Sequence, residues 1–108
     1  MAGSDWIWNI TTAEANLRRH GVSFQLAARV FQDPMSLSVG DPAAVDNVWW
    51  TLGAPDLSRP EIVLLVRSEG AASGERGRIA GARRATPTEC EAYRRCRAEV
   101  EGRHGAAV

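Results

Sequence analysis

Two adjacent arginines end the segment "RIAGARRAT" (78–86), which otherwise begins with small and apolar residues. That composition is typical of a β-strand, and its two arginines are Arg83 and Arg84. A guanidinium group binds phosphate or carboxylate through two parallel hydrogen bonds, but at a strand end it also reaches water and pairs with acids. The pair is therefore either a set of solvated charges or a site for an anionic ligand. Because successive side chains of a strand point to opposite faces, only one of the two can face a given site.

The charged residues favour recognition of phosphate without a strong overall field. All 13 basic residues are arginines, and 13 acids balance them to a net charge of zero. A neutral chain is not drawn to nucleic acid by its total charge. Residues 61–108 nevertheless carry 9 arginines against 7 acids, whereas residues 1–60 carry 4 against 6. Arginine matches phosphate through two hydrogen bonds, which lysine does not.

One histidine stands where acid–base chemistry is possible. An imidazole has a free pKa of about 6.5, which suits proton transfer near neutral pH. His20 ends the first predicted helix, and Asn16 lies one turn earlier on the same helix face. The alternative is structural, with His20 complementing the negative end of the helix dipole and Asn16 holding a neighbouring loop. His104 falls in the expected tail and is set aside.

The first half of the chain is predicted to hold one short strand and two helices. Residues 5–9 alternate two tryptophans, as a strand does. The first helix is expected to begin at a Thr11 cap and to end at Gly21. The second is expected to begin at a Ser23 cap and to end at Asp33-Pro34.

Strands dominate the second half. The alternating or apolar segments are 35–39, 48–53, 61–68 and 78–85, and a helix follows over 86–104. In a regular last strand, Arg78 shares the face of Arg84. The helix has a capping-box pattern, with Thr86 as cap, Pro87 at the first helical position and Glu89 at the third.

These elements predict an α+β protein. A small, mostly antiparallel sheet of three to four strands packs with two N-terminal helices and one C-terminal helix. We expect a single domain over residues 1–108, with a core over about 6–100 and a flexible tail over 101–108. The longest apolar run, 62–66, is too short for a bilayer, and no secretory signal is visible, so a cytoplasmic location is expected. The residues form no metal-ligand cluster, and no cofactor is expected.

Several short motifs occur in a fixed order along the chain. They are "ANLRRHGVSF" (15–24), "VFQDP" (30–34), "TLG" (51–53) and "ARRAT" (82–86), followed by Glu89 and Tyr93. In order and spacing they resemble the BrnT family, the toxin halves of type II toxin–antitoxin pairs. The resemblance implies a RelE-like fold and a ribonuclease that blocks translation. It also implies neutralisation by a BrnA-like antitoxin, whose DNA-binding part would let the complex repress its own operon.

Some polar positions of the family are replaced in this chain. Relatives commonly have Trp-Asp where Trp8-Asn9 stands, and Lys at the position of Thr12. They usually have an acidic residue and then Arg at Asn47 and Val48. Many have His or Tyr where this chain has Arg67. A BrnT-like module that binds an antitoxin without cleaving RNA is therefore the alternative to an active nuclease.

Metal-free RNA cleavage needs a base, an acid and fixed positive charge on the phosphate. The resemblance implies a catalytic role for Arg83, with His20 as the acid–base group. Arg67, Arg84 and Asn16 are expected to bind substrate, and Arg67 converges with Arg83 if the sheet order follows the hairpins. Glu89 and Tyr93 are further possible site residues, although Glu89 would also close the capping box and Tyr93 would also pack on the sheet.

Two adjacent tryptophans present a separate question. Trp49 and Trp50 lie in one predicted strand and must face opposite sides of the sheet. At most one can lie in a single-sided core. The other is then covered by a helix, stacks on a base or anchors a protein partner.

Overall fold

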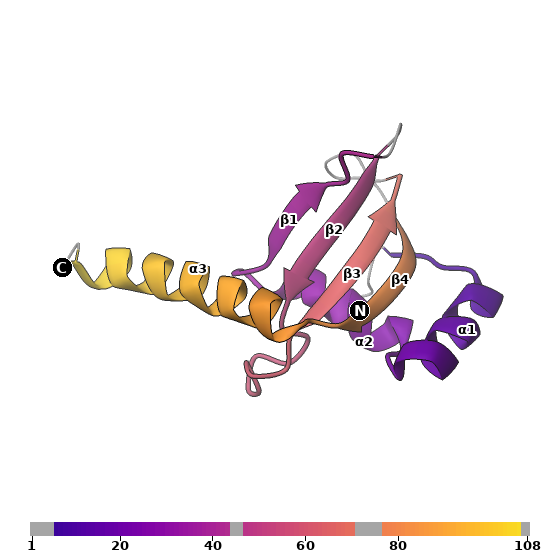
Figure 1. Ribbon diagram of the computed structural model, residues 1–108, viewed down its shortest axis with the longest axis horizontal. Helices are drawn as coiled ribbons and strands as arrows, with labels where there is room; N and C mark the ends of the chain where they lie inside the picture. Colours follow the sequence, from indigo (N-terminus) through magenta and orange to yellow (C-terminus); the bar gives the residue numbers. More distant parts are fainter. Residues whose placement is uncertain (1–5, 44–46, 71–76, 107–108) are drawn as a thin grey trace.

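The computed structural model describes residues 6–43, 47–70 and 77–106, which form a sheet with helices at one face (Figure 1). Three α-helices, one 3-10 helix and four strands follow in the order α1 (Ile10–His20), α2 (Phe24–Ala28), η1 (Arg29–Gln32), β1 (Leu37–Gly40), β2 (Val48–Gly53), β3 (Leu64–Glu69), β4 (Arg78–Arg84) and α3 (Pro87–Ala106). The strands pair antiparallel in the order β1-β2-β3-β4. The predicted α+β class, with two helices before the sheet and one after it, is confirmed.

The two faces of the sheet differ in what covers them. One face, called the helix face, packs against α1, α2 and η1 and holds the main core, which includes Phe24, Val30, Leu64, Val66, Ile79 and Ala82. The opposite face, called the open face, points toward the viewer in Figure 1, with α2 behind the strands. Strand alternation and register place on it Val39, Val48, Trp50, Leu52, Leu65, Arg67, Glu69, Arg78, Gly81 and Arg83. The start of α3 covers only its end near Leu52 and Leu65.

The predicted helix ends are mostly confirmed. Gly21 ends α1 with a left-handed φ of 69°, and its N–H donates to the Leu17 carbonyl at 2.8 Å. Ser23 caps α2 by accepting from the Leu26 N–H at 3.1 Å. The predicted Thr11 cap is wrong, because Asn9 accepts from the backbone of residues 11 and 12 at 2.9 and 3.1 Å and α1 begins at Ile10. From one residue outside the helix, the Asn9 side-chain oxygen accepts from two backbone donors of its first turn.

The first predicted strand is also wrong for its described residues 6–9. They contain a single bridge, in which Ile7 pairs parallel with Arg78. Their tryptophans pack on the helices instead. Trp6 stacks on Phe31 with ring centroids 3.9 Å apart, and Trp8 meets Phe24 edge-on at 6.1 Å. The alternating pattern therefore reflects aromatic packing.

A bulge changes the alternation of β4. Gly81 pairs with Arg67 and Ile79 pairs with Ser68, which leaves Ala80 as the additional residue. A bulge of this kind moves the residues before it to the other face. Arg78, next to the buried Ile79, therefore faces away from the side of Arg84, contrary to the prediction for a regular strand.

The last helix begins as predicted and extends away from the sheet (Figure 1). The Thr86 hydroxyl accepts from the Glu89 N–H at 3.2 Å, and the Glu89 carboxylate accepts from the Thr86 N–H at 2.8 Å. The buried Tyr93 attaches the helix to the sheet by packing with Leu52 and Val63. The helix runs to Ala106, into the segment given as a tail, whose flexibility stays a prediction. None of the described helices has the length and apolarity needed to cross a bilayer.

Candidate functional site

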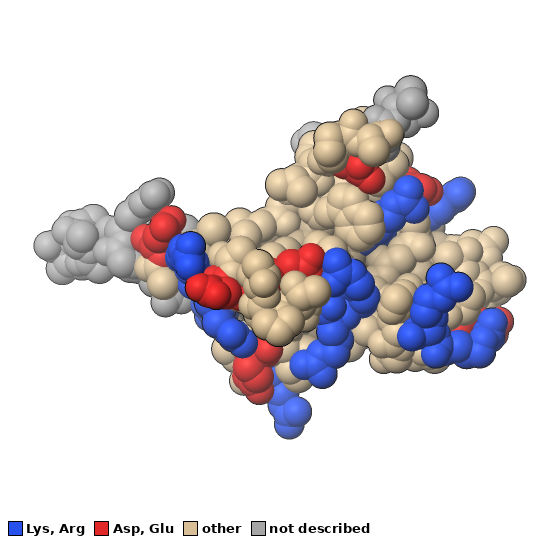
Figure 2. Space-filling model, viewed as in Figure 1, with Lys and Arg blue, Asp and Glu red and all other residues tan. Residues whose placement is uncertain are grey.

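Two arginines from neighbouring strands lie together on the open face. Leu65 pairs with Arg83 and Arg67 pairs with Gly81, so Arg67 and Arg83 are diagonal neighbours on one face of β3 and β4. Diagonal neighbours in a sheet remain within reach of long side chains. Figure 2 shows this face, where basic side chains adjoin a large uncharged area of the sheet. The arrangement is able to place two guanidinium groups on one anionic ligand.

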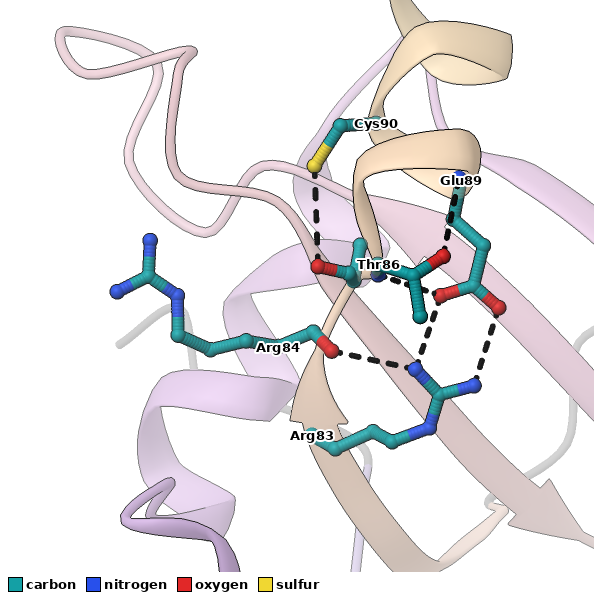
Figure 3. A network of polar contacts seen from close by, with 6 residues as sticks. Arg83, Arg84, Thr86, Glu89 and Cys90 are labelled. Atoms are coloured by element: carbon teal, nitrogen blue, oxygen red, sulfur yellow. Dashed lines mark hydrogen bonds and ion pairs between the residues drawn. The ribbon is translucent and has the colours of Figure 1, made fainter.

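Arg83 is held by an acid in the free protein (Figure 3). Its Nη1 and Nη2 donate to Glu89 Oε1 and Oε2 at 2.9 and 3.0 Å, and Nη1 also donates to the Arg84 carbonyl at 3.2 Å. The hydrogen bonds to Glu89 raise the pKa of Arg83, and those from Arg83 lower the pKa of Glu89. The two side chains are 36% and 29% exposed, so solvent and ligands reach the pair. A phosphate bound here has to share Arg83 with Glu89.

Arg67 is held more loosely. Its Nη1 lies 3.6 Å from Glu69 Oε2, which is an ion pair but too long for a hydrogen bond. Arg67 in β3 is paired directly with Trp50 in β2. The Trp50 indole N–H donates to Asp41 Oδ2 at 3.2 Å, and Asp41 also accepts from the Ala43 N–H. Those two hydrogen bonds, the one from Ala43 first, lower the pKa of Asp41.

Asn16 and His20 lie on the other side of β4 from these arginines. Asn16 is buried, and its Nδ2 donates to the Val22 and Ala82 carbonyls at 3.0 and 2.9 Å while its Oδ1 accepts from the Ala82 N–H at 3.1 Å. The Asn16 amide therefore pairs with both backbone groups of Ala82, as the backbone of a further strand would do at this edge of β4. His20 is exposed and lines a cavity of about 160 Å³ with Thr12, Asn16, Arg19 and Ala80. The contacts of Asn16 with Ala82 place α1, and His20 with it, beside the free edge of β4 (Figure 1), whereas Arg83 contacts Glu89 on the open face.

Of the two remaining predicted residues, one lies on the helix face and the other is buried beneath the start of α3. Arg84 is exposed, and pairing with Leu64 places its side chain on the helix face. Tyr93 is buried and its hydroxyl donates to Asp33 Oδ2. Burial first, and the contact with Asp33 second, raise the pKa of Tyr93 to about 12, so this hydroxyl keeps its proton.

Asp33 is a buried polar residue that the sequence pattern predicted only as a helix stop. Its Oδ1 accepts from the Met35 N–H at 2.9 Å, and its Oδ2 accepts from the Ala54 N–H at 2.9 Å as well as from Tyr93. One carboxylate thus joins the end of η1, the end of β2 and α3. The sequence signal was the Asp-Pro pair, which marks a turn but does not reveal partners distant in the chain.

Three carboxylates are the titratable groups that accompany the arginines of the open face: Asp41, Glu69 and Glu89. Among residues 6–43, 47–70 and 77–106, no group of three His, Cys, Asp or Glu side chains is placed to hold a metal ion.

Comparison with known proteins identifies the class to which this fold and face belong. The family model for BrnT, the ribonuclease toxin of type II toxin–antitoxin systems, matches residues 8–89, and the chain belongs to this family. A crystal structure of the Brucella abortus ribonuclease toxin, BrnT, matches with a TM-score of 0.54 and 21% sequence identity. The match covers 74% of this chain and 94% of that one, and at this identity it supports the fold. No curated protein matches the chain.

The family match contains the open-face residues and stops near the start of α3. Trp50, Arg67, Arg83 and Glu89 fall inside residues 8–89, whereas the helix beyond Glu89 falls outside. Val48 lies on the open face opposite Glu69.

Proposed function

We propose that this chain is the toxin of a type II toxin–antitoxin system and acts as a metal-independent endoribonuclease that inhibits translation. Its substrate is RNA in the cytoplasm, and a BrnA-like antitoxin neutralises it and links the complex to DNA. The observation that supports this most is the placement of Arg67 and Arg83 on one exposed face of a BrnT-family fold. Guanidinium groups so placed stabilise the charge that develops on a phosphate during cleavage.

The proton transfers fall to a smaller set of groups. Glu89 contacts Arg83 directly, so it is the carboxylate closest to a phosphate bound there. A carboxylate beside an arginine stays ionised and is able to take the proton of a ribose 2′-hydroxyl. His20 belongs to α1, which contacts the free edge of β4 through Asn16, so it acts on the same phosphate only if the RNA extends from Arg83 to that edge.

Cleavage of labelled RNA by the purified protein in EDTA tests this function. Arg83→Gln is expected to slow cleavage by about 100-fold or more, as loss of one charge-stabilising group does. Arg84→Gln, on the opposite face of the same strand, is the matched control and is expected to cleave normally. Induction of the wild-type chain should arrest growth, and co-expression of the antitoxin should restore it. Intact RNA at every protein concentration, without growth arrest, would refute the proposal.

A protein-interaction module without nuclease activity is the second candidate, and one observation favours it. At Val48 the open face carries an apolar side chain where relatives usually carry arginine, and the Asn9 side chain is used to cap α1. Tight binding to the antitoxin with no RNA cleavage would establish this function instead.

A further inference from the structure

We propose that Trp50 and Arg67 form a subsite for one nucleotide of single-stranded RNA, with the base stacked on the indole ring and a phosphate bound by the guanidinium group. This inference rests on the proposed function in one respect, namely that the ligand is RNA. It assigns a phosphate contact to Arg67 and a base contact to Trp50 in β2. Neither residue belongs to the motifs by which this chain resembles the family.

The register brings the two side chains close together. Trp50 and Arg67 are directly opposite across β2 and β3. The Gly70 N–H donates to the Asn47 carbonyl at 2.8 Å, which makes the pair 47/70 a hydrogen-bonded one. Because such pairs alternate, Trp50 and Arg67 form a non-hydrogen-bonded pair, the type in which opposite side chains lie closest. An indole and a guanidinium side by side match the base and phosphate of one nucleotide.

The indole ring is oriented and is half-buried, so part of it is exposed to solvent. Its N–H is fixed by Asp41, which the Ala43 N–H holds in turn. On the side away from Arg67, Trp50 is paired with Val39, whose side chain is 63% exposed. The helices α1 and α2 pack on the opposite face, and the start of α3 covers the end near Leu52. Stacking on a pre-oriented ring costs little conformational entropy, and every base offers a face for it.

Of Arg67 and Arg83, Arg67 is the one more readily taken by a phosphate. Arg83 makes a bidentate contact with Glu89 that a phosphate must displace or share. Arg67 has its Glu69 partner at 3.6 Å, beyond hydrogen-bond distance. The nearby Glu69 still competes electrostatically with an incoming phosphate. Glu69→Gln is therefore expected to strengthen RNA binding several-fold, whereas Arg67→Gln weakens it.

The test measures binding of a fluorescein-labelled 2′-O-methyl oligoribonucleotide by anisotropy, since a ligand without a free 2′-hydroxyl is not cleaved. Trp50→Leu is expected to bind about 5- to 100-fold more weakly, from the usual strength of stacking on an aromatic side chain. Trp50→Phe keeps a ring but loses the bond to Asp41, and it should stay close to wild type. Trp49→Leu, in the neighbouring residue on the helix face, is the matched control and should bind normally.

Two further measurements separate stacking from other effects. An abasic oligomer of the same length should bind wild type and Trp50→Leu equally, because it has no base to stack. Arg67→Gln should reduce the slope of log affinity against log salt by about 0.7, the value for one phosphate contact on a single strand, and Arg84→Gln should not. Equal losses in Trp49→Leu and Trp50→Leu, or a loss in Trp50→Leu that persists with the abasic oligomer, would overturn the subsite.

Parallel assays on unmodified RNA and on the antitoxin distinguish this inference from the proposed function. A protein that binds through Trp50 without cutting RNA would refute the nuclease and keep the subsite. A protein that cuts RNA while Trp50→Leu binds the oligomer normally would refute the subsite alone. If Trp50→Leu weakens antitoxin binding and leaves RNA binding unchanged, Trp50 is a protein anchor and the subsite is wrong.

Discussion

The contact between Arg83 and Glu89 predicts a measurable coupling in stability. Arg83→Ala removes a bidentate pair that is about one-third exposed, and exposed pairs contribute about 0.2–1 kcal/mol. Glu89→Ala removes the same pair and also the bond to the Thr86 N–H, which adds about 0.5–1 kcal/mol as a lost capping contact. We therefore expect Glu89→Ala to cost about 1–2 kcal/mol and Arg83→Ala to cost about half as much.

A double-mutant cycle followed by circular dichroism measures this. For a chain of this size, each 1 kcal/mol lowers Tm by about 4–8 °C, so both single variants are resolved. The double variant should be less destabilised than the sum, by about 0.5–1 kcal/mol. Arg95→Ala is the control, because its partner Glu91 lies on the exposed surface of α3 outside the capping box. Additive single variants, or an Arg83→Ala variant less stable than Glu89→Ala, would refute the reasoning.

Three more predictions follow from the same contacts. The pKa of Glu89 is lowered, so its contribution to stability is present above the pKa of an unfolded glutamate and is lost as pH falls through the lowered value. The Tm difference between wild type and Arg83→Ala should therefore disappear in acid. A difference that persists there would argue against the pair. Tyr93 is the single tyrosine, and its pKa is raised to about 12. Absorbance titration should therefore show phenolate forming near that pH, with stability of the folded state lost as pH rises through it. Titration near 10 in the folded protein would contradict the contact with Asp33. Asn16→Ala leaves the Ala82 N–H and carbonyl without their partner and should cost about 2 kcal/mol or more in urea unfolding, whereas His20→Ala, at an exposed position, should be close to neutral; equal effects would contradict the structural role of Asn16.

Local chemistry predicted the elements well where one side chain determines the outcome. Gly21, Ser23 and the Thr86–Glu89 box are each confirmed, because a cap depends on residues two to four apart. Asn9 was missed since the helix beginning at Thr11 also satisfied a capping pattern, and only the folded geometry shows which oxygen reaches the backbone.

The candidate site was predictable in part. The shared face of Arg67 and Arg83 follows from the order of the hairpins and from strand alternation, and both can be predicted from the sequence. The bulge at Ala80 moved Arg78 to another face, and nothing in the local pattern marks that residue. The position of His20 depends on how α1 docks at the edge of β4, and the pairing of Arg83 with Glu89 depends on the turn into α3. Both are tertiary properties.

The amide of Asn16 also affects how copies of this chain are able to associate. Asn16 occupies the backbone N–H and carbonyl of Ala82, and Ile7 binds the Gly77 carbonyl and the Ile79 N–H, so part of that edge of the sheet has its hydrogen-bonding groups occupied. Among the described strands, β1 forms the opposite edge and pairs only with β2. An unpaired strand edge is a template for a further strand, and these contacts remove that template along part of β4. The side chain that fixes α1 against β4 thereby also opposes edge-to-edge pairing with another chain at Ala82.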